Sequence, residues 1–155
     1  MNQKLLIAVV TLGVLFSISL FFKGDDQPMM SGMNTNSIPY QDAQAVALGK
    51  IIYQQQCVSC HGVNLEGQAN WRERGADGRL PAPPHDESGH TWHHPDGMLI
   101  GMVTYGIGPF APEGYQSNMP AYREILSEQE ILGVLAYIKS TWSPVIQQRH
   151  DQMSQ

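Results

Sequence analysis

The five residues CVSCH at positions 57–61 decide how the rest of this 155-residue chain can be interpreted. They supply two thiols and one imidazole. On a turn of helix, positions i, i+3 and i+4 share one face, so Cys57, Cys60 and His61 can all address a single flat object. Gly62 has no side chain and lets the backbone turn away close to that object. The spacing therefore predicts one shared ligand for the three side chains.

Attachment of a c-type haem is the chemistry that this spacing favours. Each thiol can add to one vinyl group of the haem, and a nitrogen of His61 can bind the iron as the proximal ligand. A zinc site is an alternative, but it would need two more ligands and the chain has no second cysteine pair. A structural disulfide and a thioredoxin-like dithiol are the others, although a dithiol of that kind would sit in a βαβ unit. We predict one covalent haem c.

The opposite face of the iron needs a second ligand or an open pocket, and methionines are the first candidates. Met119 lies in loop sequence before the last predicted helix, and Pro120 restricts its backbone to an extended conformation. A thioether on a stiff loop is neutral and soft, so it favours ferrous iron and raises the reduction potential. Met98 and Met102 are spaced by four on a predicted helix, as core methionines are. We predict His61 and Met119 as the two iron ligands.

Histidines in one stretch of loop are the alternative source of ligands: His85, His90, His93 and His94. Such a cluster could hold a separate metal ion or give bis-histidine haem ligation. Imidazoles in loops also pack, cap helices and hydrogen-bond haem propionates, and this structural interpretation is the favoured one. Three tryptophans could line the haem or pack in the core: Trp71, Trp92 and Trp142.

The overall charge excludes one class of partner. The chain has 9 lysines and arginines against 14 aspartates and glutamates, which gives a formal net charge of −5. Binding to nucleic acid would need a local basic patch, and the sequence shows none. We therefore expect no nucleic-acid partner, and an acidic domain that could be steered toward basic patches on redox proteins.

Residues 1–23 are predicted to form a transmembrane signal anchor. The stretch from Leu5 to Phe22 is an uncharged run of 18 residues, which is close to the length that spans a bilayer. Lys4 and the free amino terminus favour an N-terminus on the cytoplasmic side. The rest of the chain would then lie on the periplasmic side of the cytoplasmic membrane. A cleavable signal peptide is the alternative.

Residues 24–37 are predicted to be a flexible linker between the anchor and the domain. The stretch is rich in Gly, Ser, Asn and Asp and shows no hydrophobic period. Its methionines, Met29, Met30 and Met33, permit a copper(I) interpretation because thioethers are soft ligands. Methionines in a linker are more often simply tolerated.

One all-α domain is expected over residues 38–143, followed by a C-terminal tail, 144–155. Helical spacing of apolar residues predicts helices over 39–53, 96–103 and 127–139. Asp96 is the expected N-cap of the second helix, and Ser127 with Glu130 forms a capping box on the last. Long loops join these three to four helices, so the domain buries little apolar surface unless a haem fills its core.

The same residues resemble the class I c-type cytochromes over about residues 41–142. The resemblance is carried by Gly49 and Tyr53 ahead of the cysteines, by Val134, Leu135 and Tyr137 in the last helix, by LPAP at 80–83, and by NMPAY at 118–122. It implies a cytochrome c-like fold in which the first and last helices cross at the small residue. It also implies that the carbonyl of Pro83 orients the proximal histidine, and that Met119 is the methionine ligand. The longer loop between His61 and Asp96 departs from the family pattern.

The resemblance further implies a function, which we state as an expectation. The domain would be an electron carrier and not an enzyme, with its haem iron alternating between Fe(II) and Fe(III). Its donor would be a dehydrogenase or a quinol-oxidising complex, and its acceptor an oxidase or a reductase. Two alternatives remain: a haem subunit of an oxidoreductase or terminal oxidase complex, and a small-substrate haem enzyme with a displaceable sixth ligand.

Overall fold

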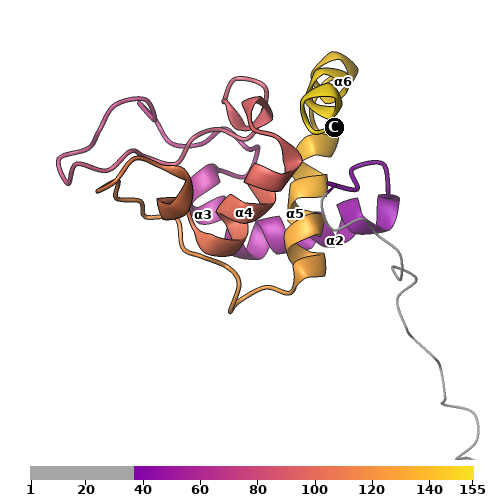
Figure 1. Cartoon of the computed structure of the whole chain (residues 1–155), viewed down its shortest axis with the longest axis horizontal. Helices are drawn as coiled ribbons and strands as arrows, with labels where there is room; N and C mark the ends of the chain where they lie inside the picture. Colours follow the sequence, from indigo (N-terminus) through magenta and orange to yellow (C-terminus); the bar gives the residue numbers. More distant parts are fainter. Residues whose placement is uncertain (1–36) are drawn as a thin grey trace, which may run out of the picture. The chain divides into compact units, whose positions relative to one another are not determined.

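The computed structural model describes residues 37–155, and every regular element in that range is helical (Figure 1). The helices are α2 (Ala43–Gln56), α3 (Val58–His61), α4 (Asp96–Tyr105), α5 (Glu128–Ser140) and α6 (Pro144–Met153), with 3₁₀ turns η1 (Thr91–His93) and η2 (Gly108–Phe110). Long loops join these elements, which fits the expected all-α cytochrome c-like class. The one-turn helix α3 and the helix α6 add to the helices that the apolar spacing predicts.

Helix α2 begins later and ends later than its apolar spacing predicts. The side chain of Asp42 accepts hydrogen bonds from the backbone N–H groups of Gln44 and Ala45, at 2.8 and 3.4 Å. An aspartate that satisfies two first-turn donors fixes the start of a helix. The predicted start at Pro39 is therefore wrong, and α2 runs to Gln56, directly before the cysteines.

Helix α5 forms the centre of the core, and its expected capping box is confirmed. The Ser127 hydroxyl accepts from the backbone N–H of Glu130, and the Glu130 carboxylate accepts from the backbone N–H of Ser127. Its buried apolar residues are Ile131, Leu132, Val134, Leu135, Ala136 and Ile138. The apolar stripe that predicts this helix is the surface it buries.

Helices α2 and α5 cross with their backbones in contact at Gly49 and Gly133. A Cβ atom built on Gly49 would lie 1.7 Å from the carbonyl oxygen of Gly133. No side chain fits between the two helices at this point. One turn further along α2, the ring of Tyr53 packs against that of Tyr137, with centroids 5.4 Å apart. The crossing thus sets the path of α2 toward the cysteines.

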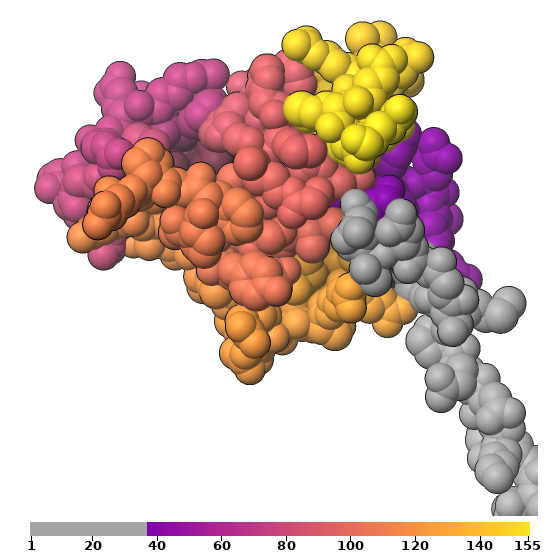
Figure 2. All heavy atoms as spheres, in the orientation of Figure 1, coloured from indigo at the N-terminus to yellow at the C-terminus, as the bar shows by residue number. Residues whose placement is uncertain are grey.

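The predicted C-terminal tail contains helix α6, which starts at Pro144. Pro at the first helical position is favourable because its missing N–H would have no partner there. Figure 2 shows α6 in yellow beside the salmon residues that precede and begin α4. His150 has no exposed surface, and its Nε2 atom donates to the carbonyl of His94 at 2.8 Å. The ring also lies edge-on to Trp142, with centroids 5.1 Å apart.

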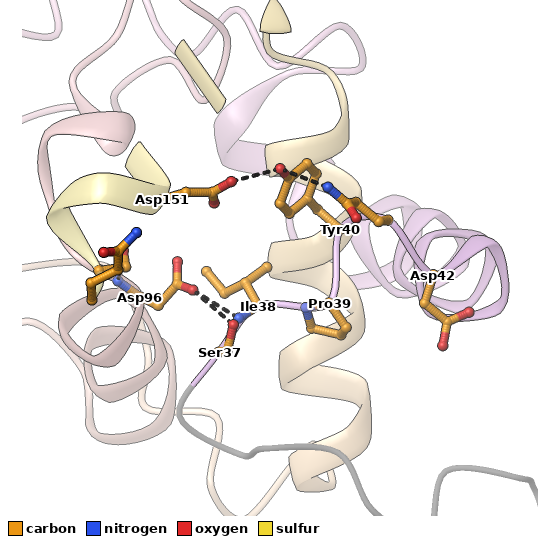
Figure 3. Close-up of a pocket in the computed structure, with 10 residues that line it drawn as sticks. Ser37, Ile38, Pro39, Tyr40, Asp42, Asp96 and Asp151 are labelled. Carbon is orange, nitrogen blue, oxygen red and sulfur yellow. Dashed lines mark hydrogen bonds between the residues drawn. The ribbon is translucent and has the colours of Figure 1, made fainter. Parts of the chain in front are cut away.

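Asp96 is the buried residue that joins the start of the described chain to its end. We expected Asp96 to be an N-cap, but Pro95 holds that position and Asp96 is the first residue of α4. Its carboxylate accepts from the backbone N–H of Ile38 at 2.9 Å. Figure 3 shows this contact in a groove that residues 37–42, Asp96 and Asp151 line. Asp96 caps no helix because its carboxylate turns inward to this contact.

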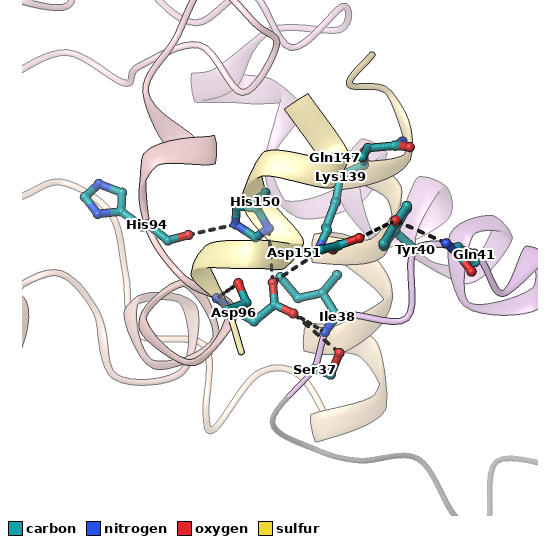
Figure 4. A network of polar contacts seen from close by, with 11 residues as sticks. Ser37, Ile38, Tyr40, Gln41, His94, Asp96, Lys139, Gln147, His150 and Asp151 are labelled. Carbon is teal, nitrogen blue, oxygen red and sulfur yellow. Dashed lines mark hydrogen bonds and ion pairs between the residues drawn. The ribbon is translucent and has the colours of Figure 1, made fainter. Parts of the chain in front are cut away.

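A buried cation completes this polar network (Figure 4). The ammonium group of Lys139, 1 % exposed, lies 3.2 Å from a carboxylate oxygen of Asp96 and 2.7 Å from one of Asp151. Asp151 also accepts from the hydroxyl of Tyr40 at 2.8 Å. A buried cation needs such partners because desolvation would otherwise be costly. The network holds α4, α5, α6 and residues 37–40 together.

Two predicted segments lie outside the described residues: the anchor, 1–23, and all of the linker except Ser37. Between residues 37 and 155, the structure contains no helix that is long and apolar enough to span a membrane. The anchor and the linker therefore stay predictions.

Gly49→Ala tests the helix crossing. The new methyl group would collide with the Gly133 carbonyl, so the free energy of unfolding should fall by about 2 kcal/mol or more. Gly97→Ala is the matched control, because a Cβ there meets nothing within 4 Å on a helix; it should be neutral or stabilise by up to about 1 kcal/mol. Denaturant unfolding of both variants measures the effect. Equal stability of the two would contradict the crossing.

His150→Gln tests the buried network through pH. Burial, and then the charge of Lys139, lower the pKa of His150 below 6.5, so the unfolded chain takes up a proton more readily than the folded one. The stabilisation from neutral His150 is complete above pH 6.5 and is lost as the pH falls below it. Asp96 and Asp151, which also face the ring, oppose this shift without reversing it.

Glutamine cannot titrate but can still donate to the His94 carbonyl. The free energy of unfolding should therefore fall less for His150→Gln than for the wild type between about pH 8 and about pH 5. Denaturant unfolding at each pH gives the two slopes. Parallel slopes would show that His150 does not resist protonation in the folded state.

Candidate functional site

The residues CVSCH form one helical turn directly after α2. The backbone N–H groups of Cys60 and His61 both donate to the carbonyl of Cys57, at 3.1 and 2.9 Å. The turn ends at Gly62, which adopts a φ of +80° that favours glycine. Cys57 and His61 are therefore four residues apart on a real helical turn, as their spacing predicts.

The thiols of this turn are unsuited to two of the alternatives. Burial, and then the neighbouring Cys60, raise the pKa of Cys57 to about 11, whereas redox-active dithiols depend on a lowered thiol pKa. No disulfide joins Cys57 to Cys60. Within residues 37–155, no group of three His, Cys, Asp or Glu side chains is placed to hold a metal ion. The turn has the chemistry of an attachment site and lacks the extra ligands of a zinc site.

His61 is buried, and one hydrogen bond fixes its tautomer. Its Nδ1 atom lies 2.8 Å from the carbonyl oxygen of Pro83. A carbonyl can only accept, so Nδ1 carries the proton and Nε2 keeps its lone pair. Burial lowers the pKa of His61, so the ring is neutral at neutral pH. A neutral imidazole oriented through its other nitrogen is the usual state of a metal-binding histidine.

Pro83 reaches His61 because two glycines let the backbone pass close by. A Cβ on Gly67 would lie 2.4 Å from the backbone N of Pro84, and one on Gly89 would lie 2.0 Å from the carbonyl of Pro84. A backbone hydrogen bond joins the same two loop segments, since the N–H of Gln68 donates to the Ala82 carbonyl at 2.9 Å. The contact between Pro83 and His61 that the resemblance implies is thus present and closely supported.

Two tyrosine hydroxyls tie the turn to the rest of the fold. Tyr53, on α2, donates to the carbonyls of Gly62 at 3.0 Å and His61 at 3.3 Å. Tyr122 donates to the carbonyl of Gln56 at 3.0 Å. Tyr122 belongs to the NMPAY segment, so this bond joins the predicted methionine motif to the start of the attachment turn.

Met119 lies outside this hydrogen-bonded unit. It belongs to the loop of residues 106–126, where it is partly buried and its N–H donates to the hydroxyl of Ser117 at 3.0 Å. The next residue toward the N-terminus, Asn118, accepts from the guanidinium of Arg79 at 2.7 Å. The structure therefore brings Cys57, Cys60, His61 and Pro83 together, and holds Met119 on a second loop.

Arg79 is a further candidate site residue, which the sequence analysis does not name. Its Nε atom is buried and has no hydrogen-bond partner among residues 37–155. An unsatisfied buried donor is costly, and a carboxylate is the acceptor that a guanidinium fits best. Haem carries two propionates, so this donor, the two thiols and the free lone pair on His61 fit a haem c. No motif around Arg79 indicates that its Nε atom is buried, because that burial depends on how the loop folds.

The histidine-rich loop packs its rings against other rings. His90 stacks on Trp71 with centroids 5.2 Å apart, and His93 stacks on Trp92 at 3.7 Å. The structural interpretation of these histidines therefore agrees with the geometry better than a separate metal site. His85 differs from them because its ring stacks on His61, at 3.9 Å. Trp142, expected in the core or at the haem, is buried.

Comparisons with known proteins identify the family of this region. The sequence model of the Cytochrome c family matches residues 46–142. The chain is 29% identical over 96 residues to the cbb3-type cytochrome c oxidase subunit FixP of Azorhizobium caulinodans, covering 62% of this chain and 29% of that protein. It is 38% identical over 63 residues to cytochrome c-550 of Bacillus subtilis, covering 41% of this chain and 51% of that protein.

These matches are partial on both sides. The chain spans 29% and 51% of the length of the two curated relatives it matches. No solved structure matches the chain. The shared region contains the attachment turn, Pro83 and Met119, and it ends at Trp142, before α6.

Proposed function

This chain belongs to the cytochrome c family, and from that membership we propose that it is an electron-transfer protein with one covalent haem c. It carries single electrons between respiratory redox partners and has no substrate of its own to transform. The relatives support this, since one is named a cytochrome c and the other a subunit of a cytochrome c oxidase.

The observation that carries the proposal is the hydrogen bond between His61 Nδ1 and the Pro83 carbonyl. It leaves the lone pair on His61 Nε2, in a ring that burial keeps neutral. The same turn presents Cys57 and Cys60. One helical turn thus offers an iron ligand and two points of covalent attachment to a single ring system.

The residues of this chain do three things for a bound haem. Cys57 and Cys60 would hold it through thioether bonds, and His61 would bind its iron. A haem c supplies an iron that takes up and releases one electron at a time. Pro83 and Tyr53 restrain the turn from two sides, so the turn would hold its side chains in one arrangement around a bound haem. Such rigidity suits an electron carrier.

Met119 is the proposed sixth ligand. Its loop is tied on one side to Arg79 through Asn118 and on the other to Gln56 through Tyr122. The second tie reaches the residue directly before the attachment turn, and the first reaches the loop that follows it. Pro120 also stiffens the backbone next to Met119. A thioether held in this way stabilises ferrous iron.

Two physiological roles are open to such a domain. In the first, it is a carrier that takes electrons from a dehydrogenase or a quinol-oxidising complex and gives them to an oxidase or a reductase. In the second, it is a haem subunit fixed within a terminal oxidase. The similarity to FixP, a cytochrome c oxidase subunit, supports the second role as an alternative to the first.

We also place the haem domain on the periplasmic side of the cytoplasmic membrane, held by residues 1–23. The support is the uncharged run of 18 residues and the charge of Lys4 before it. The chain has two cysteines, and haem attachment would use both, so none would be left for a disulfide on that side of the membrane.

Met119→Ala tests the ligand set. The ferric protein should lose its near-infrared sulfur-to-iron band, because the thioether ligand is gone, while a pyridine haemochrome assay still finds one haem c per chain. Met102→Ala, which removes a partly buried thioether from α4, is the matched control and should keep the band.

A band that survives in Met119→Ala would assign the sixth position to another residue. A wild-type protein with an open sixth position would favour the small-substrate haem enzyme instead. If expression with the haem-attachment machinery yields no haemochrome, the proposed function is wrong.

Replacing residues 1–23 with a cleavable signal peptide tests the membrane anchor. The haem-stained protein should move from the membrane fraction to the soluble periplasmic fraction, because the apolar run is the only proposed attachment. The full-length chain, washed with high salt, is the control and should stay with the membrane. The anchor is refuted if the full-length protein is soluble and its mature N-terminus begins after residue 23.

A further inference from the structure

We propose that His85 is a positioning residue for the proximal ligand, holding the plane of the His61 ring by stacking on its face. The proposal rests on the proposed function, in which His61 binds the haem iron. It assigns to one histidine of the loop a role that its neighbours do not share, because only His85 stacks on an expected iron ligand among the described residues.

The geometry gives His61 two restraints in different directions. The Pro83 carbonyl holds one edge of the ring, at Nδ1, over 2.8 Å. A hydrogen bond at one edge still allows the ring to tilt about that bond. The His85 ring covers one face, with centroids 3.9 Å apart and planes inclined by 23°. Stacking opposes the tilt that the hydrogen bond allows.

His85 can restrain another ring because four contacts fix its own position. Its backbone N–H donates to the Leu65 carbonyl at 2.7 Å, and its carbonyl accepts from the indole N–H of Trp142 at 2.8 Å. Its Nδ1 atom lies 2.9 Å from the hydroxyl of Thr91. Tyr53 stands edge-on to the ring, with centroids 6.4 Å apart. The ring is held by backbone, side chain and packing together.

The hydroxyl of Thr91 also indicates which nitrogen of His85 carries its proton. Thr91 donates to the carbonyl of Pro84 at 3.4 Å, so its oxygen is free to accept from Nδ1 of His85. Pro84 directly follows Pro83, whose carbonyl accepts the hydrogen bond from Nδ1 of His61. Residues 83–85 therefore supply both restraints from one short segment, the edge contact through the backbone and the face contact through a side chain.

The orientation of the proximal imidazole matters for an electron carrier. The plane of an axial histidine sets its overlap with the iron orbitals, and groups that orient a ligand tune the metal. A ring free to tilt would give a range of iron environments. A ring stacked against His85 gives one, so the loss of the flat partner should appear in the spectrum of the ferric iron.

Two variants of the haem-loaded protein separate stacking from other roles of His85. His85→Leu fills similar space without a flat face, whereas His85→Phe keeps the flat face. Both lose the hydrogen bond to Thr91, so the loss of that bond cannot explain a difference between them. His93→Ala is the control on the same loop, since His93 is exposed and stacks on Trp92.

The readout is the low-spin ferric electron paramagnetic resonance signal, with the reduction potential measured beside it. We expect His85→Leu to broaden and shift the largest g value and to change the potential, and His85→Phe and His93→Ala to match the wild type. If His85→Leu keeps a wild-type signal and potential, or if His85→Phe broadens as much as His85→Leu, the positioning role is wrong. A wild-type protein without haem c, seen by pyridine haemochrome, would instead overturn the proposed function and this role with it.

Discussion

The contact between the backbones of Gly49 and Gly133 is the constraint on which the rest of the site depends. Because no side chain separates α2 from α5, the path of α2 beyond the crossing has little freedom. One turn later, Tyr53 links α2 to the attachment turn, since its ring packs on Tyr137 and its hydroxyl donates to the carbonyl of Gly62. The position of the attachment turn therefore depends on a contact between two peptide backbones. The same contact packs the core and places the expected haem ligands.

Local features were predictable where the interacting residues are neighbours in sequence. The turn at residues 57–61 depends on i, i+4 geometry, and the capping box of Ser127 and Glu130 joins residues three apart, so spacing alone revealed both. The all-α class followed from apolar spacing. The contact between Pro83 and His61 needed the family resemblance, because no spacing rule links residues 22 apart. The roles of Cys57, Cys60, His61, Met119 and Pro83 toward the haem stay predictions.

Long-range polar contacts could not be predicted from the sequence. Asp96 is a residue type that often caps helices. Its carboxylate instead accepts hydrogen bonds from Ile38 and Lys139, which are distant in the chain. A lysine in an apolar helix stripe gives no sign of burial until its partners are known. The role of His85 could not be predicted either. The sequence has four histidines in this loop, and the path of the loop decides that His85 is the one that stacks on His61. Such residues satisfy charges and donors that arise from the fold itself.

The network around Asp96 also has a topological consequence. The hydroxyl of Ser37 lies 3.5 Å from the Asp96 carboxylate, and the backbone N–H of Asp96 donates to the hydroxyl of Ser154 at 3.0 Å. Residues near both ends of the described chain thus meet at one residue, Ser37 at the carboxylate of Asp96 and Ser154 at its backbone N–H, and a short linker could join residue 154 to residue 37. The two ends of the described chain therefore lie close together. The chain could be opened instead at Gly78, an exposed turn where a Cβ would meet nothing within 4 Å, and circular permutants cut at exposed sites of this kind commonly fold.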